Sequence, residues 1–112
     1  MRFKDGLEMS RGKHSLSMAA LKGIMISSEV YNEMGIYGSR ATVTSLLDGR
    51  HMQGSKHYTG EAWDLRTWNA SKSGQMTDTA KEALAASLRT ALGDDYDVVV
   101  EKTHIHCEHD PS

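Results

Sequence analysis

The sequence predicts one small α+β domain over residues 1–112, with a mainly antiparallel sheet and two principal helices. The first observation is the length, because 112 residues suffice for one hydrophobic core but not for two. The second is the composition, 38% hydrophobic and 25% charged, which is typical of a folded protein rather than a disordered one. The third is the order of the expected elements: helix, strand, loop, strand, helix, strand and strand. That order is typical of α+β domains.

The first helix is expected over residues 15–33. Gly35 is a natural end for it, because glycine readily adopts the left-handed conformation that follows a last helical turn. Gly23 is unfavourable inside a helix and weakens the pattern. The apolar residues that recur near helical spacing are Leu21, Ile24, Met25 and Tyr31.

Two short β-favouring runs, residues 40–45 and 61–67, enclose a polar, glycine-rich segment over residues 48–60. We expect the two runs to be strands and the segment between them to be a loop. Loops carry a large share of binding and catalytic residues, so the histidine and arginine side chains of this loop mark a candidate site.

The second helix is expected to begin at a capping box, residues 79–82, and to end at Gly93. Two strands then complete the chain, over residues 96–100 and 103–107, the second continuing or pairing with the first. The apolar residues expected on one face of the second helix are Leu84, Leu88, Ala91 and Leu92.

The charge and the apolar pattern exclude several classes of partner. A formal charge of −2 and the lack of any Lys/Arg run exclude a basic nucleic-acid surface. No apolar stretch approaches the ~20 residues that a membrane-spanning helix needs. The N-terminal residues MRFKDGLEMSRGKH lack the apolar segment of a signal peptide, so the protein is expected in the cytoplasm as synthesised.

Residues 55–64, SKHYTGEAWD, hold the strongest functional signal. His57 offers an imidazole nitrogen and Asp64 a carboxylate oxygen, both common zinc ligands. In the expected strand, Asp64 lies on the face opposite Trp63 and Leu65, which point into the core. Strands disfavour aspartate, and a ligand role accounts for its presence. The alternative is a hydrogen-bonded loop histidine and an edge-strand aspartate.

Residues 101–107, EKTHIHC, hold the second signal. In a strand, His104 and His106 project from the same face. Two imidazoles on one face suit a metal site or an acid–base site. A lone His-x-His is often structural, but here the first segment supplies two metal ligands and lacks a third.

Together the two segments resemble a known family. Ser-x-His-x-x-Gly-x-Ala-x-Asp, followed by a C-terminal His-x-His, is similar to the motifs of the zinc D-Ala-D-Ala carboxypeptidases and their phage endolysin relatives. Hedgehog signalling domains share their fold. The resemblance covers about residues 42–111. It implies one Zn²⁺ per chain and hydrolysis of peptide bonds in peptidoglycan, with action on the cell wall after release for a phage-encoded member.

The resemblance also implies that His57 and Asp64 are zinc ligands, with a third from the histidine pair. Hedgehog-type members use the second histidine, which is His106 here. Many peptidases of the family instead follow an acid-x-x-His pattern with the acid as catalytic base, which Glu101 and His104 match. We favour His106 as the ligand, with His104 beside it in a catalytic or supporting role.

The identity of the base follows from the same resemblance. Threonine, Thr103, stands where the family has an acid, so Glu101 is the nearest carboxylate and the expected base. A regular strand would point Glu101 away from the histidines, and a bulge around Lys102 or Thr103 would bring it back.

Family members further carry an arginine that binds the terminal carboxylate of the substrate, a task for a fixed bidentate donor. Arg50 and Arg40 are the candidates here, and we favour Arg50 because it lies in the loop. Ser55, the first residue of the motif, is a second candidate substrate contact. The competing hypothesis for the whole chain is a zinc-binding module of the same fold that lacks catalytic activity.

Overall fold

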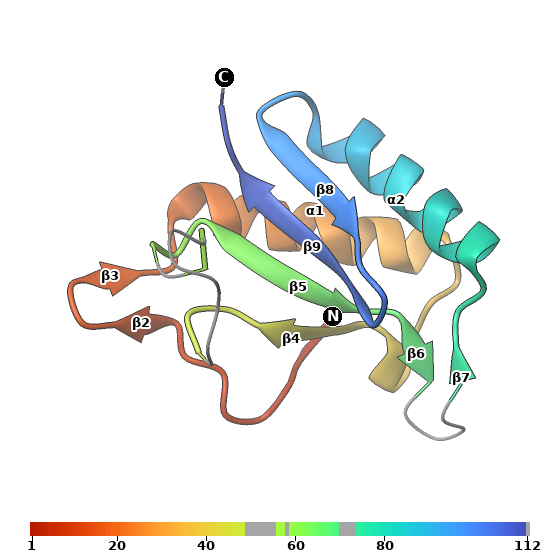
Figure 1. The fold of residues 1–112 in the computed structure, drawn as a ribbon, viewed down its shortest axis with the longest axis horizontal. Coiled ribbons are helices and arrows are strands. Elements are labelled where there is room, and N and C mark those ends of the chain that lie inside the picture. The colour runs from red at the N-terminus through yellow and green to blue at the C-terminus, as the bar shows by residue number, and fades with distance from the viewer. Residues whose placement is uncertain (49–55, 58, 70–73, 112) are drawn as a thin grey trace.

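A computed structural model describes residues 1–48, 56–57, 59–69 and 74–111. A five-stranded sheet with the strand order β1-β4-β5-β9-β8 packs against two helices (Figure 1). The first strand runs parallel to β4, and the other neighbouring strands are antiparallel. The predicted α+β class with a mainly antiparallel sheet is therefore confirmed. The elements are β1 Arg2–Phe3, α1 Met18–Glu33, β4 Thr42–Ser45, β5 Ala62–Arg66, α2 Asp78–Leu92, β8 Tyr96–Val100 and β9 His104–His109.

Several short elements were not expected from the sequence. They are the antiparallel pair β2 Ser10–Arg11 and β3 His14–Ser15, the 3₁₀ helix η1 Gly38–Arg40, and the antiparallel pair β6 Trp68–Asn69 and β7 Gly74–Gln75. Two- and three-residue elements are too short to show a hydrophobic period, so no sequence pattern marks them.

Both helices lie on one face of the sheet, which leaves the other face uncovered by helices (Figure 1). Alternate residues of the central strands point into the core between the sheet and the helices, as expected for Trp63 and Leu65. The residues between them, including Asp64 and His106, point to the opposite face. Neither α1 nor α2, in the described part of the chain, is long and apolar enough to cross a membrane.

Helix α1 begins three residues later than expected, because the Ser17 side chain caps it by accepting a hydrogen bond from the Ala20 backbone N–H at 3.0 Å. It ends as predicted, before Gly35, which has a φ of 74°. Ile24 and Tyr31 are buried, whereas Met25 is 69% exposed and does not belong to the core face.

Helix α2 begins at Asp78, so the capping box expected at residues 79–82 is wrong. Thr77, not Thr79, has the extended conformation of a cap, and its hydroxyl accepts from the Ala80 backbone N–H at 3.1 Å. Capping at Thr77 also places the Asp78 carboxylate in the first turn, where the helix dipole favours it. Gly93 ends the helix with a φ of 84°. The buried apolar face is Leu84, Ala85, Leu88 and Leu92, whereas Ala91 is exposed.

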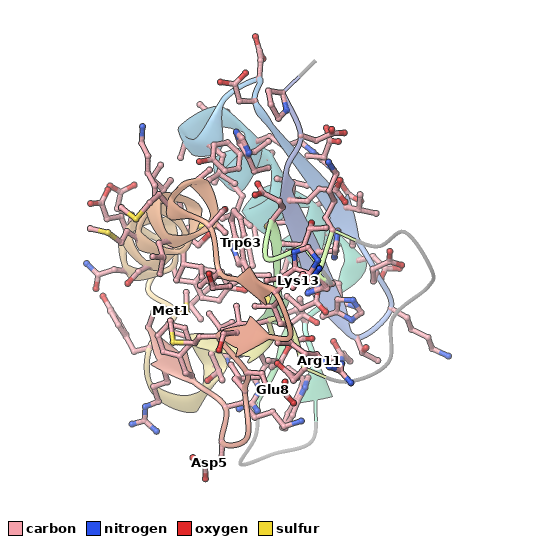
Figure 2. The ribbon with its side chains drawn as sticks, turned by 90° about the vertical axis from the view of Figure 1, so that its left-hand side faces the viewer. Met1, Asp5, Glu8, Arg11, Lys13 and Trp63 are labelled. Atoms are coloured by element: carbon pink, nitrogen blue, oxygen red, sulfur yellow. The ribbon has the colours of Figure 1, made fainter. Side chains whose placement is uncertain are left out.

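Gly23 is required because the indole ring of Trp63 packs directly on α1 at this point. A Cβ atom at Gly23 would collide with the ring. The Trp63 Nε1–H donates to Ser27 Oγ at 3.1 Å, and the Ser27 hydroxyl donates to the Gly23 carbonyl at 2.8 Å. Figure 2 shows Trp63 between α1 and the strands. This contact fixes the distance between the helix and the strand that carries Asp64.

We expect Gly23→Ala to destabilise the fold. Forcing an extra methyl group into a filled core costs about 1–3 kcal/mol, and the better helix propensity of alanine returns only part of that. The free energy of unfolding should fall in denaturant titration. The change should shrink in a Trp63→Leu background, where the ring is absent, whereas Lys22→Ala on the exposed face of α1 should have little effect. An equal loss in both backgrounds would contradict the packing explanation.

Candidate metal centre

The pairing of β5 with β9 brings Asp64 and His106 together. They are register partners on adjacent antiparallel strands, so their side chains leave the same face side by side. His106 Nδ1 lies 2.9 Å from Asp64 Oδ1. Asp64 is buried although it lies on the face without helices.

His57 completes the cluster from the connection that precedes β5. It is 2% exposed, and its Nε2 lies 3.0 Å from the same oxygen, Asp64 Oδ1. Two backbone hydrogen bonds close the turn that carries it, from Gly60 N–H to the His57 carbonyl at 3.2 Å and from Glu61 N–H to the Lys56 carbonyl at 2.9 Å.

Gly60 allows the backbone to form this turn. Its φ of +77° is strained for other residues, and a Cβ atom there would collide with the Ser15 carbonyl. The Ser17 backbone N–H donates to the Gly60 carbonyl at 2.9 Å. The position of His57 therefore depends on the segment that leads into α1.

In each histidine, the ring nitrogen that does not face Asp64 (the outer nitrogen) forms a hydrogen bond to another group. His57 Nδ1 lies 2.6 Å from the Leu46 carbonyl, which only accepts, so this nitrogen carries the proton and donates. His106 Nε2 lies 2.9 Å from the Glu108 carboxylate and donates in the same way. In the neutral rings, the remaining nitrogens, His57 Nε2 and His106 Nδ1, present lone pairs toward Asp64.

Asp48 orders the backbone at Leu46, the residue whose carbonyl accepts from His57. Its carboxylate oxygen Oδ1 accepts from the Leu46 backbone N–H at 2.9 Å and from the Glu8 backbone N–H at 3.3 Å. The structure shows that it orders the turn that presents the Leu46 carbonyl to His57.

The cluster therefore places three electron-pair donors around one point. His57, Asp64 and His106 each offer one ligand atom, and these atoms all lie within 4.8 Å of one another. Two lone pairs and a carboxylate repel one another unless a positive charge lies between them. A proton on one histidine or a metal ion supplies that charge, so the three residues could hold a metal ion.

The ionisation of the cluster agrees with this geometry. Burial acts to raise the pKa of Asp64, but hydrogen bonds with His106 and His57 and the nearby histidine charges outweigh it and hold that pKa well below its usual range. Burial acts to lower the pKa of His106, but the carboxylates of Asp64 and Glu108 raise it overall. A metal ion would replace the proton that these carboxylates otherwise favour on His106.

His104 lies beside the cluster rather than within it. Its Nε2 is 3.8 Å from Asp64 Oδ2, too long for a hydrogen bond, and it is the register partner of Arg66, two residues beyond Asp64. The Thr103 hydroxyl lies 3.1 Å from His104 Nδ1. This is the arrangement expected if His106 is a ligand and His104 a neighbour.

Glu101 lies in a short turn between β8 and β9, so neither a regular strand nor a bulge sets its direction. Its backbone N–H donates to the His104 carbonyl at 2.9 Å, and its side chain is exposed. Within the described ranges, the Glu101 carboxylate forms no hydrogen bond or ion pair. The buried Lys81 ammonium donates to the Lys102 carbonyl at 2.7 Å and anchors the turn to α2.

Arg50 and Ser55, the favoured substrate contacts, fall outside the residues that the structure describes. Arg40 is exposed at the end of η1.

Glu108 is a residue of the site that sequence reasoning missed. It shares a strand face with His104 and His106, and that alternation was the available signal. We expect Glu108→Ala to weaken metal affinity by about 10–100-fold, because residues that orient a ligating histidine typically contribute that much. Glu108→Gln should lose less, since its amide oxygen still accepts from His106.

Competition with a chelating dye measures these affinities. Glu29→Ala is the matched control, because Glu29 is an exposed acid on α1, which packs against the other face of the sheet from His106. Equal losses in Glu29→Ala and Glu108→Ala would indicate a general charge effect and contradict an orienting role for Glu108.

No protein-family model matches this sequence, and no solved structure matches the chain at a significant level.

Proposed function

We propose that this protein is a zinc-dependent peptidase that hydrolyses cell-wall peptides, of the D-Ala-D-Ala carboxypeptidase or endolysin type. The observation that carries the proposal is the convergence of His57 Nε2, Asp64 Oδ1 and His106 Nδ1, with the outer nitrogen of each imidazole already hydrogen-bonded. The motif resemblance supplies the substrate class.

The donor set fits zinc. Two imidazole nitrogens and one carboxylate oxygen are the ligands of many catalytic zinc sites, which use three protein ligands and leave one position open. Zinc bound here would polarise a peptide carbonyl and lower the pKa of a water molecule toward ~7. The cluster lies on the sheet face without helices (Figure 1), where His104 and His106 are partly exposed, and an extended peptide would approach it from that face.

The chain's own residues would then move the protons. His104 is half-buried beside Asp64, and its Nε2 faces the cluster, where it can hold a proton and pass it to the leaving amine. Glu101 starts the turn that leads to His104, and it is the candidate for accepting a proton from the attacking water.

Separate substitutions of His104 and His106 should distinguish metal binding from catalysis. We expect His106→Ala to lose zinc, because its Nδ1 is one of the three converging atoms. His104→Ala should keep zinc, because His104 lies outside the cluster. It should lose most hydrolytic activity, because the leaving amine would lack the proton that His104 supplies. Zinc content by elemental analysis and cleavage of a substrate panel measure the two effects. The reverse pattern would make His104 the ligand and Glu101 the base of an acid-x-x-His site.

The proposal as a whole is tested by incubating the zinc-loaded protein with muropeptides and D-Ala-D-Ala peptides and separating the products by mass. We expect new amine and carboxylate termini at one type of bond. Zinc removal by a chelator should stop the cleavage, and added zinc should restore it.

A zinc-binding module without catalytic activity is the second candidate. The observation that favours it is the exposed Glu101 carboxylate, which contacts none of the described cluster residues. A protein that binds zinc stoichiometrically but cleaves nothing on the panel would support this candidate and contradict the peptidase.

A further inference from the structure

A cationic cleft opens next to the candidate metal centre on the same face of the sheet. Its volume is about 420 Å³ and it is lined by Arg2, Phe3, Lys4, Asp5, Thr42 and Arg66. Three of these six residues are cationic and one is acidic, so the lining carries a net charge of +2 in a protein whose overall charge is −2. A local charge opposite to that of the whole molecule indicates attraction of an anionic group.

Arg66 connects the cleft to the cluster. It follows Asp64 by two residues on β5, so both side chains leave the same face, with Cα atoms about 7 Å apart. On β9 its register partner is His104. The cleft therefore begins two residues along β5 from Asp64, one of the residues that could hold a metal.

Separate contacts order the side chain and the backbone of Arg66. Its guanidinium stacks over the Trp68 ring, with 4.2 Å between its central carbon and the ring centroid, and so leans toward Trp68. The buried Tyr31 hydroxyl donates to the Arg66 carbonyl at 2.8 Å and ties this end of β5 to α1. A guanidinium held this way loses less conformational freedom on binding an anion than a free one does.

Arg2 and Lys4 belong to the N-terminal edge strand and the residue after it. The Arg2 backbone N–H donates to the Ala41 carbonyl at 2.7 Å, and the Lys4 N–H donates to the Val43 carbonyl at 2.9 Å. Their side chains are exposed and form no ion pair with any residue in the described part of the chain. Figure 2 labels Met1 and Asp5, which lie on either side of Arg2 and Lys4 in the sequence.

We propose that this cleft binds an acidic side chain of the peptide whose backbone lies over the His57, Asp64 and His106 cluster. An extended peptide advances about 3.4 Å per residue, so a carboxylate two or three residues from the metal centre reaches the leaning Arg66 guanidinium. Planar guanidinium groups bind carboxylates with two parallel hydrogen bonds, and the flanking Arg2 and Lys4 add longer-range attraction. The inference rests on the proposed peptide substrate, but binding in the cleft needs no catalysis.

Nuclear magnetic resonance titration of the ¹⁵N-labelled full chain tests this without relying on activity. The probes are the blocked peptide acetyl-Ala-Glu-Ala-amide and its glutamine counterpart, each added to zinc-free and to zinc-loaded protein. We expect the glutamate peptide to shift the amide signals of residues 2–5 and 66 and to bind about tenfold more tightly than the glutamine peptide at low ionic strength. Binding should weaken at ~0.5 M salt, where exposed charges are screened.

Charge-removal variants assign the effect to the cleft. Arg66→Gln should reduce the preference for glutamate by about tenfold, whereas Lys22→Gln, on the exposed face of α1, should leave it unchanged. If Arg66→Gln does not fold, Lys4→Gln serves instead, with an expected loss of about two- to threefold because its exposed ammonium contributes less.

Equal binding of the glutamate and glutamine peptides would overturn the inference. So would an unchanged preference in the folded charge-removal variants, or equally tight binding of inorganic phosphate at residue 66. Glutamate-selective binding by a protein that cleaves no peptide would support the cleft and refute the peptidase, so the two proposals fail separately.

Discussion

Replacing Asp64 by alanine is expected to abolish zinc binding. The wild-type protein should retain about one zinc per chain after purification with added zinc, and the variant none above background. The reason is that Asp64 Oδ1 is the atom toward which both histidines converge, at 3.0 and 2.9 Å, and no other described carboxylate faces both rings. His57→Ala should have the same effect, since its removal leaves two ligands. Elemental analysis of the purified proteins measures the result.

His109→Ala is the matched control for that experiment. His109 is a half-buried histidine on the same strand as His106, and it pairs with Glu61 at 2.9 Å rather than with Asp64, so its removal should leave the zinc content unchanged. Wild-type protein that binds no zinc would refute the metal site. Tighter retention of Fe²⁺ than of Zn²⁺ would contradict the choice of metal, because two histidines and one carboxylate also form many non-haem iron sites.

The second large effect is expected from Glu101→Gln. Glutamine keeps the size and hydrogen bonding of the side chain but cannot accept a proton, so hydrolysis should fall by ~10²-fold or more while zinc stays bound. The exposed position of Glu101 in the turn before β9 means that the substitution should not disturb the fold. Rates on the cleaved peptide of the panel and zinc content are measured on the same preparation.

Glu29→Gln on the exposed face of α1 is the control for removing a carboxylate charge, and it should be as active as the wild type. If Glu101→Gln also equals the wild type, His104 is the better candidate for the base.

The sequence predicted the elements whose patterns are long enough to read. Both helices and strands β4, β5, β8 and β9 appear within three residues of their expected limits. The cap of α2 was misplaced because two threonines, Thr77 and Thr79, carry the same capping chemistry and only the backbone conformation distinguishes them. Gly23 counted against a helix, yet it is the position where the Trp63 ring needs the space.

The site was predictable as far as residue types and strand alternation allow. Alternation places His104 and His106 on one face but cannot say which of them lies opposite Asp64. Only the register of β5 against β9 decides this, and it pairs Asp64 with His106 and Arg66 with His104. Register depends on the tertiary fold, as do the Leu46 carbonyl behind His57 and the cleft beside Arg66.

The spacing of the cluster along the chain has a consequence for folding kinetics. His57 and Asp64 are seven residues apart, but His106 lies 42 residues beyond Asp64, so the third ligand arrives only when β9 docks on β5. Strand pairing across such a separation forms later than local helices, because the entropy of closing the loop opposes it before any contact is gained. A bound ion would therefore strengthen contacts that form late, and we expect it to lower the unfolding rate far more than it raises the folding rate. For this protein, a bound metal ion would slow the unfolding of the completed sheet rather than nucleate its formation.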